Sequence, residues 1–103
     1  MSYQSILTEV DGPLGILTLN KPERHNAFDE VLIAEITAGL RELEAHPQVR
    51  AVVLSSTGKS FCAGADLNWM KQAATFSPQE NLRDAQCLAC LMTTLHEISK
   101  PTI

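Results

Sequence analysis

Residues 60–70 read SFCAGADLNWM, and the interpretation of the rest of the chain starts from this stretch. It follows a short apolar run, AVVL at 51–54, and ends in residues that can open a helix. Ala63, Gly64 and Ala65 would let a bound group approach the main chain, and an amide just before a helix has a free N–H. Such a donor stabilises charge that develops on a substrate oxygen, by roughly 3–4 kcal/mol. The alternative is that small residues simply allow the loop to pack.

The first half of the chain predicts a hairpin followed by a helix. Residues 6–10 and 16–19 are apolar runs separated by DGPLG, which is typical of a turn. Asn26, with Asp29 three residues later, resembles a helix N-cap with an acidic first turn. An apolar stripe on this helix runs to about residue 45 and should face a sheet; it comprises Phe28, Leu32, Ile36, Leu40 and Leu43.

The second half predicts a parallel crossover and a long helix. Residues 49–55 form a mostly apolar strand that could be buried on both faces, and strand–helix–strand order implies ligands at the strand's carboxyl end. Asp66 should cap a short helix over 67–72. SPQE at 77–80 is a strong start signal for a helix whose broad apolar face needs cover on more than one side. KPTI at 100–103 resembles the start of another strand, so the predicted fold class is α/β.

Composition limits the possible partners. The 103 residues are 45% hydrophobic and 19% charged, which is typical of a globular protein. A net charge of -4 gives no broad basic face, so nucleic acid is not an expected partner. We expect no membrane partner and a cytoplasmic location, because the sequence has no leader pattern and no apolar run near the ~20 residues of a membrane span.

Metal and nucleotide sites are not indicated. Cys62, Cys87 and Cys90 cannot all pair, and we expect reduced thiols that pack in the core. The histidines, at 25, 46 and 96, lack the spacing of metal ligands. GKS at 58–60 matches the end of a phosphate-binding P-loop, but Val53 stands where that pattern needs glycine. A nucleotide-phosphate binder is therefore a remote alternative.

Two segments resemble a known family. FCAGADL at 61–67, after an AVVL strand, resembles the signature loop of the crotonase superfamily, the enoyl-CoA hydratases and isomerases. NKPERHNA at 20–27 is similar to the family's adenine-binding segment. The resemblance implies a spiral core of ββα units, of which residues 1–103 would be the N-terminal portion. It also implies that the Ala65 N–H is an oxyanion donor and that substrate or CoA is bound by Lys21, Arg24, His25, Ala27, Ala63, Gly64, Asp66, Leu67, Trp69 and Met70. In the resemblance, the basic side chains of Lys21, Arg24 and His25 lie near the phosphates of CoA.

The resemblance also implies a function. It indicates an enzyme that processes acyl-CoA thioesters through an enolate, adding water across a 2-enoyl-CoA, with CoA entering as part of the substrate and no separate cofactor. GADLNWM at 64–70 looks like methylglutaconyl-CoA hydratases of leucine and acyclic terpene breakdown. Family members assemble as trimers or hexamers. The second donor and the acid–base glutamates would lie beyond Ile103, so we expect this portion alone to be inactive. Isomerase or other family chemistry, and a truncated non-catalytic or interaction module, are alternatives.

Overall fold

The sheet has three strands and forms one layer of the fold. The computed structural model describes residues 3–103. β1 (Ile6–Asp11) and β2 (Leu14–Leu19) form the predicted hairpin, and β3 (Ala51–Ser56) lies parallel to β2 on its other side. Gly12 makes the hairpin turn with a φ of 58°, a left-handed conformation that favours glycine. The predicted α/β class is confirmed.

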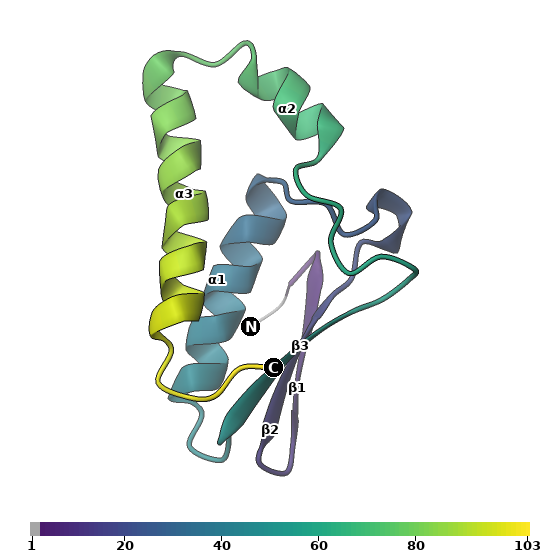
Figure 1. The fold of residues 1–103 in the computed structure, drawn as a ribbon, viewed down its shortest axis with the longest axis vertical. Helices are drawn as coiled ribbons and strands as arrows, with labels where there is room; N and C mark the ends of the chain where they lie inside the picture. The colour runs from purple at the N-terminus through teal and green to yellow at the C-terminus, as the bar shows by residue number, and fades with distance from the viewer. Residues whose placement is uncertain (1–2) are drawn as a thin grey trace.

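Helix α1 (Glu30–Ala45) covers one face of this sheet (Figure 1). Four of the five residues of the predicted stripe are buried in α1, together with Ile33 and Gly39; the buried set is Leu32, Ile33, Ile36, Gly39, Leu40 and Leu43. Phe28 lies before the helix and is half-buried. The prediction that Asn26 caps α1 is wrong, because Asp29 is the cap and accepts a hydrogen bond from Leu32 N at 2.8 Å. Asn26 cannot do this since its left-handed backbone, at φ 55°, places it in the preceding loop.

The end of the chain extends the sheet. Ile103 N donates to Val52 O and Leu54 N donates to Ile103 O, at 2.9 and 2.8 Å. The predicted strand start after residue 100 is therefore confirmed, parallel to β3. The expectation that β3 is buried on both faces is wrong for residues 3–103, in which only Val52 of this strand is buried. Helix α1 covers one face, and no other element of this part of the chain covers the second.

Two helices follow β3. α2 (Leu67–Ala73) begins at the predicted cap, Asp66, and α3 (Pro78–Glu97) begins with a complete capping box. In that box Ser77 Oγ accepts from Glu80 N at 3.2 Å, and a Glu80 carboxylate oxygen accepts from Ser77 N at 3.1 Å. Both predicted helix starts are confirmed. α3 lies alongside α1 (Figure 1).

The wide apolar face of α3 is only partly covered. Leu91 is its one buried residue, whereas the side chains of Leu82 and Met92 are 59% and 46% exposed. The expectation that this face is covered on more than one side is therefore wrong for residues 3–103, where α3 packs mainly on α1. The prediction of core packing is also wrong for Cys87 and Cys90, which are exposed, while Cys62 is partly buried against the core.

Candidate functional site

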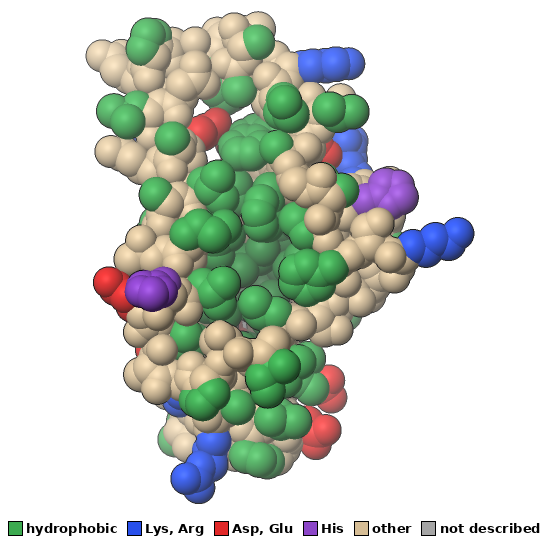
Figure 2. Space-filling model, in the orientation of Figure 1, with side chains coloured by type: hydrophobic (Ala, Val, Ile, Leu, Met, Phe, Trp, Pro, Cys, Tyr) green, Lys and Arg blue, Asp and Glu red, His purple; other side chains and the backbone are tan. Residues whose placement is uncertain are grey.

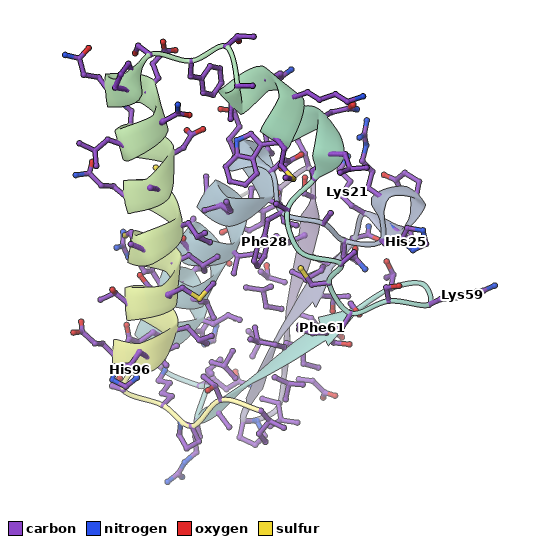
Figure 3. All side chains as sticks on the ribbon, turned by 45° about the horizontal axis from the view of Figure 1, so that its top comes forward. Lys21, His25, Phe28, Lys59, Phe61 and His96 are labelled. Atoms are coloured by element: carbon purple, nitrogen blue, oxygen red, sulfur yellow. The ribbon has the colours of Figure 1, made fainter. Side chains whose placement is uncertain are left out.

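Two loops meet beyond the carboxyl ends of β2 and β3. The first covers residues 20–28 and includes the short 3-10 helix η1 (Pro22–Arg24), and the second covers residues 57–66. Parallel strands end at the same sheet edge, so the two loops lie side by side, as Figure 3 shows for His25 and Phe28 of the first and Phe61 of the second. Lys59, at the tip of the second loop, points away from the molecule. The site thus lies where the strand order predicted a ligand.

Asn26 joins the two loops and was not among the predicted site residues. Its side chain is fully buried; Oδ1 accepts from Lys21 N at 2.7 Å, and Nδ2 donates to Thr57 O and Ser60 O at 2.8 and 2.9 Å. The amide therefore uses its oxygen within the first loop and its nitrogen on the second. The sequence signal was the residue type, since Asn adopts left-handed backbone more readily than most residues.

The backbone of Phe28 fixes the direction of the Ala65 N–H. Phe28 N donates to Gly64 O at 2.6 Å, and Asp66 N donates to Phe28 O at 2.7 Å. Gly64 C=O and Ala65 N–H belong to one peptide plane, and in a trans peptide they point in opposite directions. Because the carbonyl points at Phe28, the Ala65 N–H points away from it. No hydrogen bond within residues 3–103 uses this N–H, and Ala65 is exposed.

Glycine is needed at position 64 because of its backbone conformation, and not because a side chain there would clash. Its φ is 96°, a conformation that residues with a Cβ rarely adopt, and an added Cβ would meet nothing within 4 Å. The open space beside Gly64 leaves the Ala65 amide accessible. Ala63 on the other side is anchored, because its N–H donates to His25 O at 3.1 Å.

Asp66 is held as a carboxylate between a helix and an arginine. Oδ1 accepts from Trp69 N and Oδ2 accepts from Arg24 Nη1, each at 3.1 Å. The pKa of Asp66 is lowered, first by the Trp69 backbone N–H and then by the Arg24 charge, which together outweigh the opposing effect of burial. A carboxylate that is ionised and accepts two hydrogen bonds is suited to capping α2 and not to proton transfer.

Arg24 is hydrogen-bonded to protein groups, although about half of its side chain is exposed. Besides Asp66, Arg24 contacts Asn68. When the Asn68 amide oxygen is turned toward the guanidinium, that oxygen accepts from Nη1 at 2.8 Å and from Nη2 at 3.1 Å. Of the cations predicted to lie beside CoA phosphates, Lys21 has only a 3.9 Å contact with exposed Glu23. The phosphate role stays a prediction for both residues.

Most of the predicted site residues line one open hollow of about 480 Å³. Glu23 joins them there; the predicted residues present are Arg24, His25, Ala27, Ala63, Ala65, Asp66 and Leu67. Lys21 lies in a neighbouring hollow with Trp69. The indole of Trp69 turns toward α3, where its Nε1 donates to Asp84 at 3.2 Å. Met70 is 53% exposed and lines neither of these hollows.

A separate, apolar hollow of about 220 Å³ lies between the sheet, α1 and α3. Figure 2 shows hydrophobic side chains gathered in the middle of this face. The lining is Leu19, Phe28, Ile36, Leu40, Leu54, Phe61, Leu91, Met92 and Leu95. None of these side chains donates a hydrogen bond, so the hollow is not itself a place for charge chemistry.

Residues 3–103 contain no group of three or more His, Cys, Asp or Glu side chains that could hold a metal ion. His25 and His96 lie on opposite sides of the molecule (Figure 3). In the same part of the chain, no helix is long and apolar enough to cross a membrane.

A family model described as enoyl-CoA hydratase/isomerase matches residues 9–103. The chain belongs to this family. It is 42% identical over 71 residues to a probable enoyl-CoA hydratase of Rhizobium meliloti, covering 69% of this chain and 28% of the relative. It is 40% identical over 63 residues to 1,2-epoxyphenylacetyl-CoA isomerase of Escherichia coli, covering 61% of this chain and 24% of the relative.

The crystal structure of an enoyl-CoA hydratase from Shewanella pealeana superposes with a TM-score of 0.94 at 38% identity, covering 96% of this chain and 37% of that one. The resemblance to the crotonase superfamily is thereby confirmed for the family and for the fold. The chain spans about a quarter to two fifths of the length of these enoyl-CoA hydratase/isomerase relatives.

Proposed function

We propose that this chain supplies an oxyanion donor, the Ala65 N–H, to an enzyme that processes acyl-CoA thioesters. The observation that carries the proposal is the peptide between Gly64 and Ala65: its carbonyl is engaged by Phe28, and its N–H is directed into the open without a partner in residues 3–103. A donor fixed before the reaction needs no reorganisation when the thioester oxygen gains charge. One such donor lowers the barrier by roughly 3–4 kcal/mol.

The reaction proposed first is hydration of a 2-enoyl-CoA. Relatives that cover most of this chain have names of that activity, which supports the proposal. Conjugate addition of water places charge on the thioester oxygen as the enolate forms, and the Ala65 N–H would stabilise that oxygen. The second donor and the acid–base groups are proposed to lie outside these 103 residues. Coenzyme A would enter as part of the substrate, and no other cofactor is proposed.

Isomerisation is the second candidate. The 40% identical Escherichia coli relative bears an isomerase name, so closely similar sequences in this region occur with a different reaction. Both reactions need the same charge on the same oxygen, and they differ in where protons or water are delivered. Methylglutaconyl-CoA as the substrate, trimeric or hexameric assembly and a cytoplasmic location are finer proposals that rest on the family resemblance.

Ala65→Pro in the complete protein tests the donor, because it deletes the N–H and places the ring Cδ where that hydrogen stood. We expect kcat for a 2-enoyl-CoA to fall about 10²- to 10³-fold, the effect typical of losing one oxyanion donor. Ala65→Gly is the matched control; it keeps the N–H and should stay within about tenfold of the parent, well above the proline variant. A folded Ala65→Pro protein with unchanged turnover would refute the role, and circular dichroism checks the folding.

A titration with acetyl-CoA and with ATP separates the remaining alternatives. Binding of acetyl-CoA without ATP binding supports the proposal. Binding of ATP alone would favour a nucleotide-phosphate site, and binding of neither would favour a non-catalytic module.

A further inference from the structure

We propose that Arg24 is a positioning residue that holds the Ala65 N–H in place, and that it does not bind the phosphates of CoA. This inference rests on the proposed function of Ala65. It assigns Arg24 a different task from the one that the basic character of residues 21–25 predicts. Three observations carry it: the contacts of the guanidinium, the burial of its partner and the position of that partner in the chain.

The guanidinium is hydrogen-bonded to one residue of the second loop and one residue of α2. Nη1 donates to Asp66 Oδ2 at 3.1 Å, and Asn68, with its amide oxygen turned toward the guanidinium, accepts from Nη1 and Nη2 at 2.8 and 3.1 Å. The planar fork of arginine matches such a pair of acceptors, which a lysine ammonium cannot span in the same way. These contacts use three of the five guanidinium N–H groups, so a phosphate that also took the fork facing Asp66 and Asn68 would have to displace a partner.

Breaking the ion pair between Arg24 and Asp66 would be energetically unfavourable. The side chain of Asp66 is only 7% exposed, whereas that of Arg24 is 49% exposed. Its other oxygen is already used by Trp69 N. Turning the guanidinium toward a ligand would leave a buried carboxylate without its counter-charge, and such a group is strongly destabilising.

Asp66 is the residue next to the proposed donor. Its own N–H donates to Phe28 O, and Phe28 N donates to Gly64 O, so the residues on either side of Ala65 are both bonded to Phe28. Arg24 holds Asp66 through its side chain and lies in the same loop as Phe28. The two loops are therefore joined beside Ala65 by the backbone of Phe28 and by the Arg24–Asp66 pair, and removing the charge leaves the Phe28 contacts and the more distant Asn26 amide to hold the loops together.

This arrangement predicts which kinetic constant changes. A misplaced donor loses transition-state stabilisation, and a misplacement of about 1 Å can cost about 10²-fold in rate. For Arg24→Gln we therefore expect kcat to fall about 10- to 100-fold, with KM and the Kd of acetyl-CoA within about threefold of the parent. A phosphate ligand would give the opposite pattern, with KM and Kd raised and kcat retained.

Lys21→Gln is the comparison variant, because it removes a neighbouring positive charge that is not part of the clamp, the hydrogen-bonded group of Arg24, Asp66 and Asn68. If Lys21 is the cation beside the phosphates, it should raise KM and Kd. Arg24→Lys keeps the charge but loses the fork, and we expect it to resemble Arg24→Gln in kcat. An Arg24→Lys protein with full kcat would overturn the need for the fork.

Amide hydrogen exchange tests the proposal without any activity. The reporters are Phe28 N–H and Asp66 N–H, measured by NMR in the complete protein without substrate. Arg24→Gln should speed exchange at both by at least about tenfold, and Lys21→Gln should leave both unchanged. Unaltered exchange together with unaltered kcat would overturn the proposal. Faster exchange in a protein that turns over no acyl-CoA would instead mean that the clamp is real and the proposed function is wrong.

A double-mutant cycle with Asp66→Asn guards against a general folding defect. If Arg24 acts through Asp66, adding Arg24→Gln to the Asp66→Asn variant should lower kcat by less than about threefold relative to Asp66→Asn alone. Full additivity of the two losses would contradict action through Asp66.

Discussion

Replacing Asn26 with Ala should separate the two loops that form the site. Asn26 is fully buried, and its amide hydrogen bonds with three backbone groups: Lys21 N, Thr57 O and Ser60 O. Alanine cannot reach any of them. The left-handed backbone at φ 55° is also unfavourable for alanine.

The size of the effect follows from these contacts. A backbone group that loses its partner away from solvent costs about 1–3 kcal/mol, and about 1 is appropriate here since all three bonds are only partly buried. The left-handed backbone adds about 1 kcal/mol. We therefore expect Asn26→Ala to lower the free energy of unfolding by about 4 kcal/mol, which is a large share of the 5–15 kcal/mol typical of a folded protein.

Urea unfolding of the complete protein measures this value. Asn26→Asp is a matched variant that keeps the acceptor for Lys21 N but turns an oxygen toward the carbonyls of Thr57 and Ser60; we expect a loss of about 2–3 kcal/mol. Asn81→Ala, at an exposed position of α3, should change stability by no more than about 0.5 kcal/mol. If Asn26→Ala and Asn81→Ala had equal effects, the argument that Asn26 joins the loops would be refuted.

Other changes should act through single contacts. Because the pKa of Asp66 is lowered in the folded protein, its carboxylate adds stability that is complete above the ordinary pKa of 3.8 and is lost as the pH falls further. Asp66→Asn should therefore lower the free energy of unfolding by about 1 kcal/mol at pH 7. Urea titrations at several pH values should show a weaker loss of stability in acid for this variant than for the parent. Gly39→Ala should destabilise by about 1–3 kcal/mol despite the better helix propensity of alanine, because its Cβ would lie 2.9 Å from side-chain atoms of Ile6 and Leu17; a higher melting temperature would contradict this. Lys100→Met should lower stability by about 1 kcal/mol by removing the ammonium that donates to the last carbonyls of α1, and an unchanged urea midpoint would contradict that role.

The elements of this fold could be predicted from the sequence because their signals are local. The capping box of Ser77 and Glu80 lies within four residues, and Asp66 caps the helix that begins at the next residue. The position of Ala65 at the start of that helix followed from the same signal. Such features depend on neighbours in sequence and need no knowledge of the tertiary structure.

The side-chain partners could not be predicted in the same way. Asn26 bonds to Thr57 and Ser60, more than 30 residues away, and Arg24 pairs with Asp66 at a separation of 42. Only the packing of the two loops brings these groups together. The family resemblance places Arg24 near the phosphates of CoA, whereas in residues 3–103 its side chain pairs with a carboxylate of the chain itself.

Hydrophobic pattern also predicted more burial than residues 3–103 provide. Cys87 and Cys90 lie on an apolar stretch of α3, but that helix packs mainly against α1, and both side chains are exposed. A pattern shows that a face can be buried; whether it is buried depends on the element that covers it.

A crystal structure of the complete protein with an unreactive acyl-CoA analogue tests the central proposal most directly. We predict that the thioester oxygen lies roughly 2.7–3.1 Å from the Ala65 nitrogen, which is the distance expected for an oxyanion donor. A thioester oxygen bound elsewhere, with the Ala65 N–H donating to an acceptor within the protein, would contradict it.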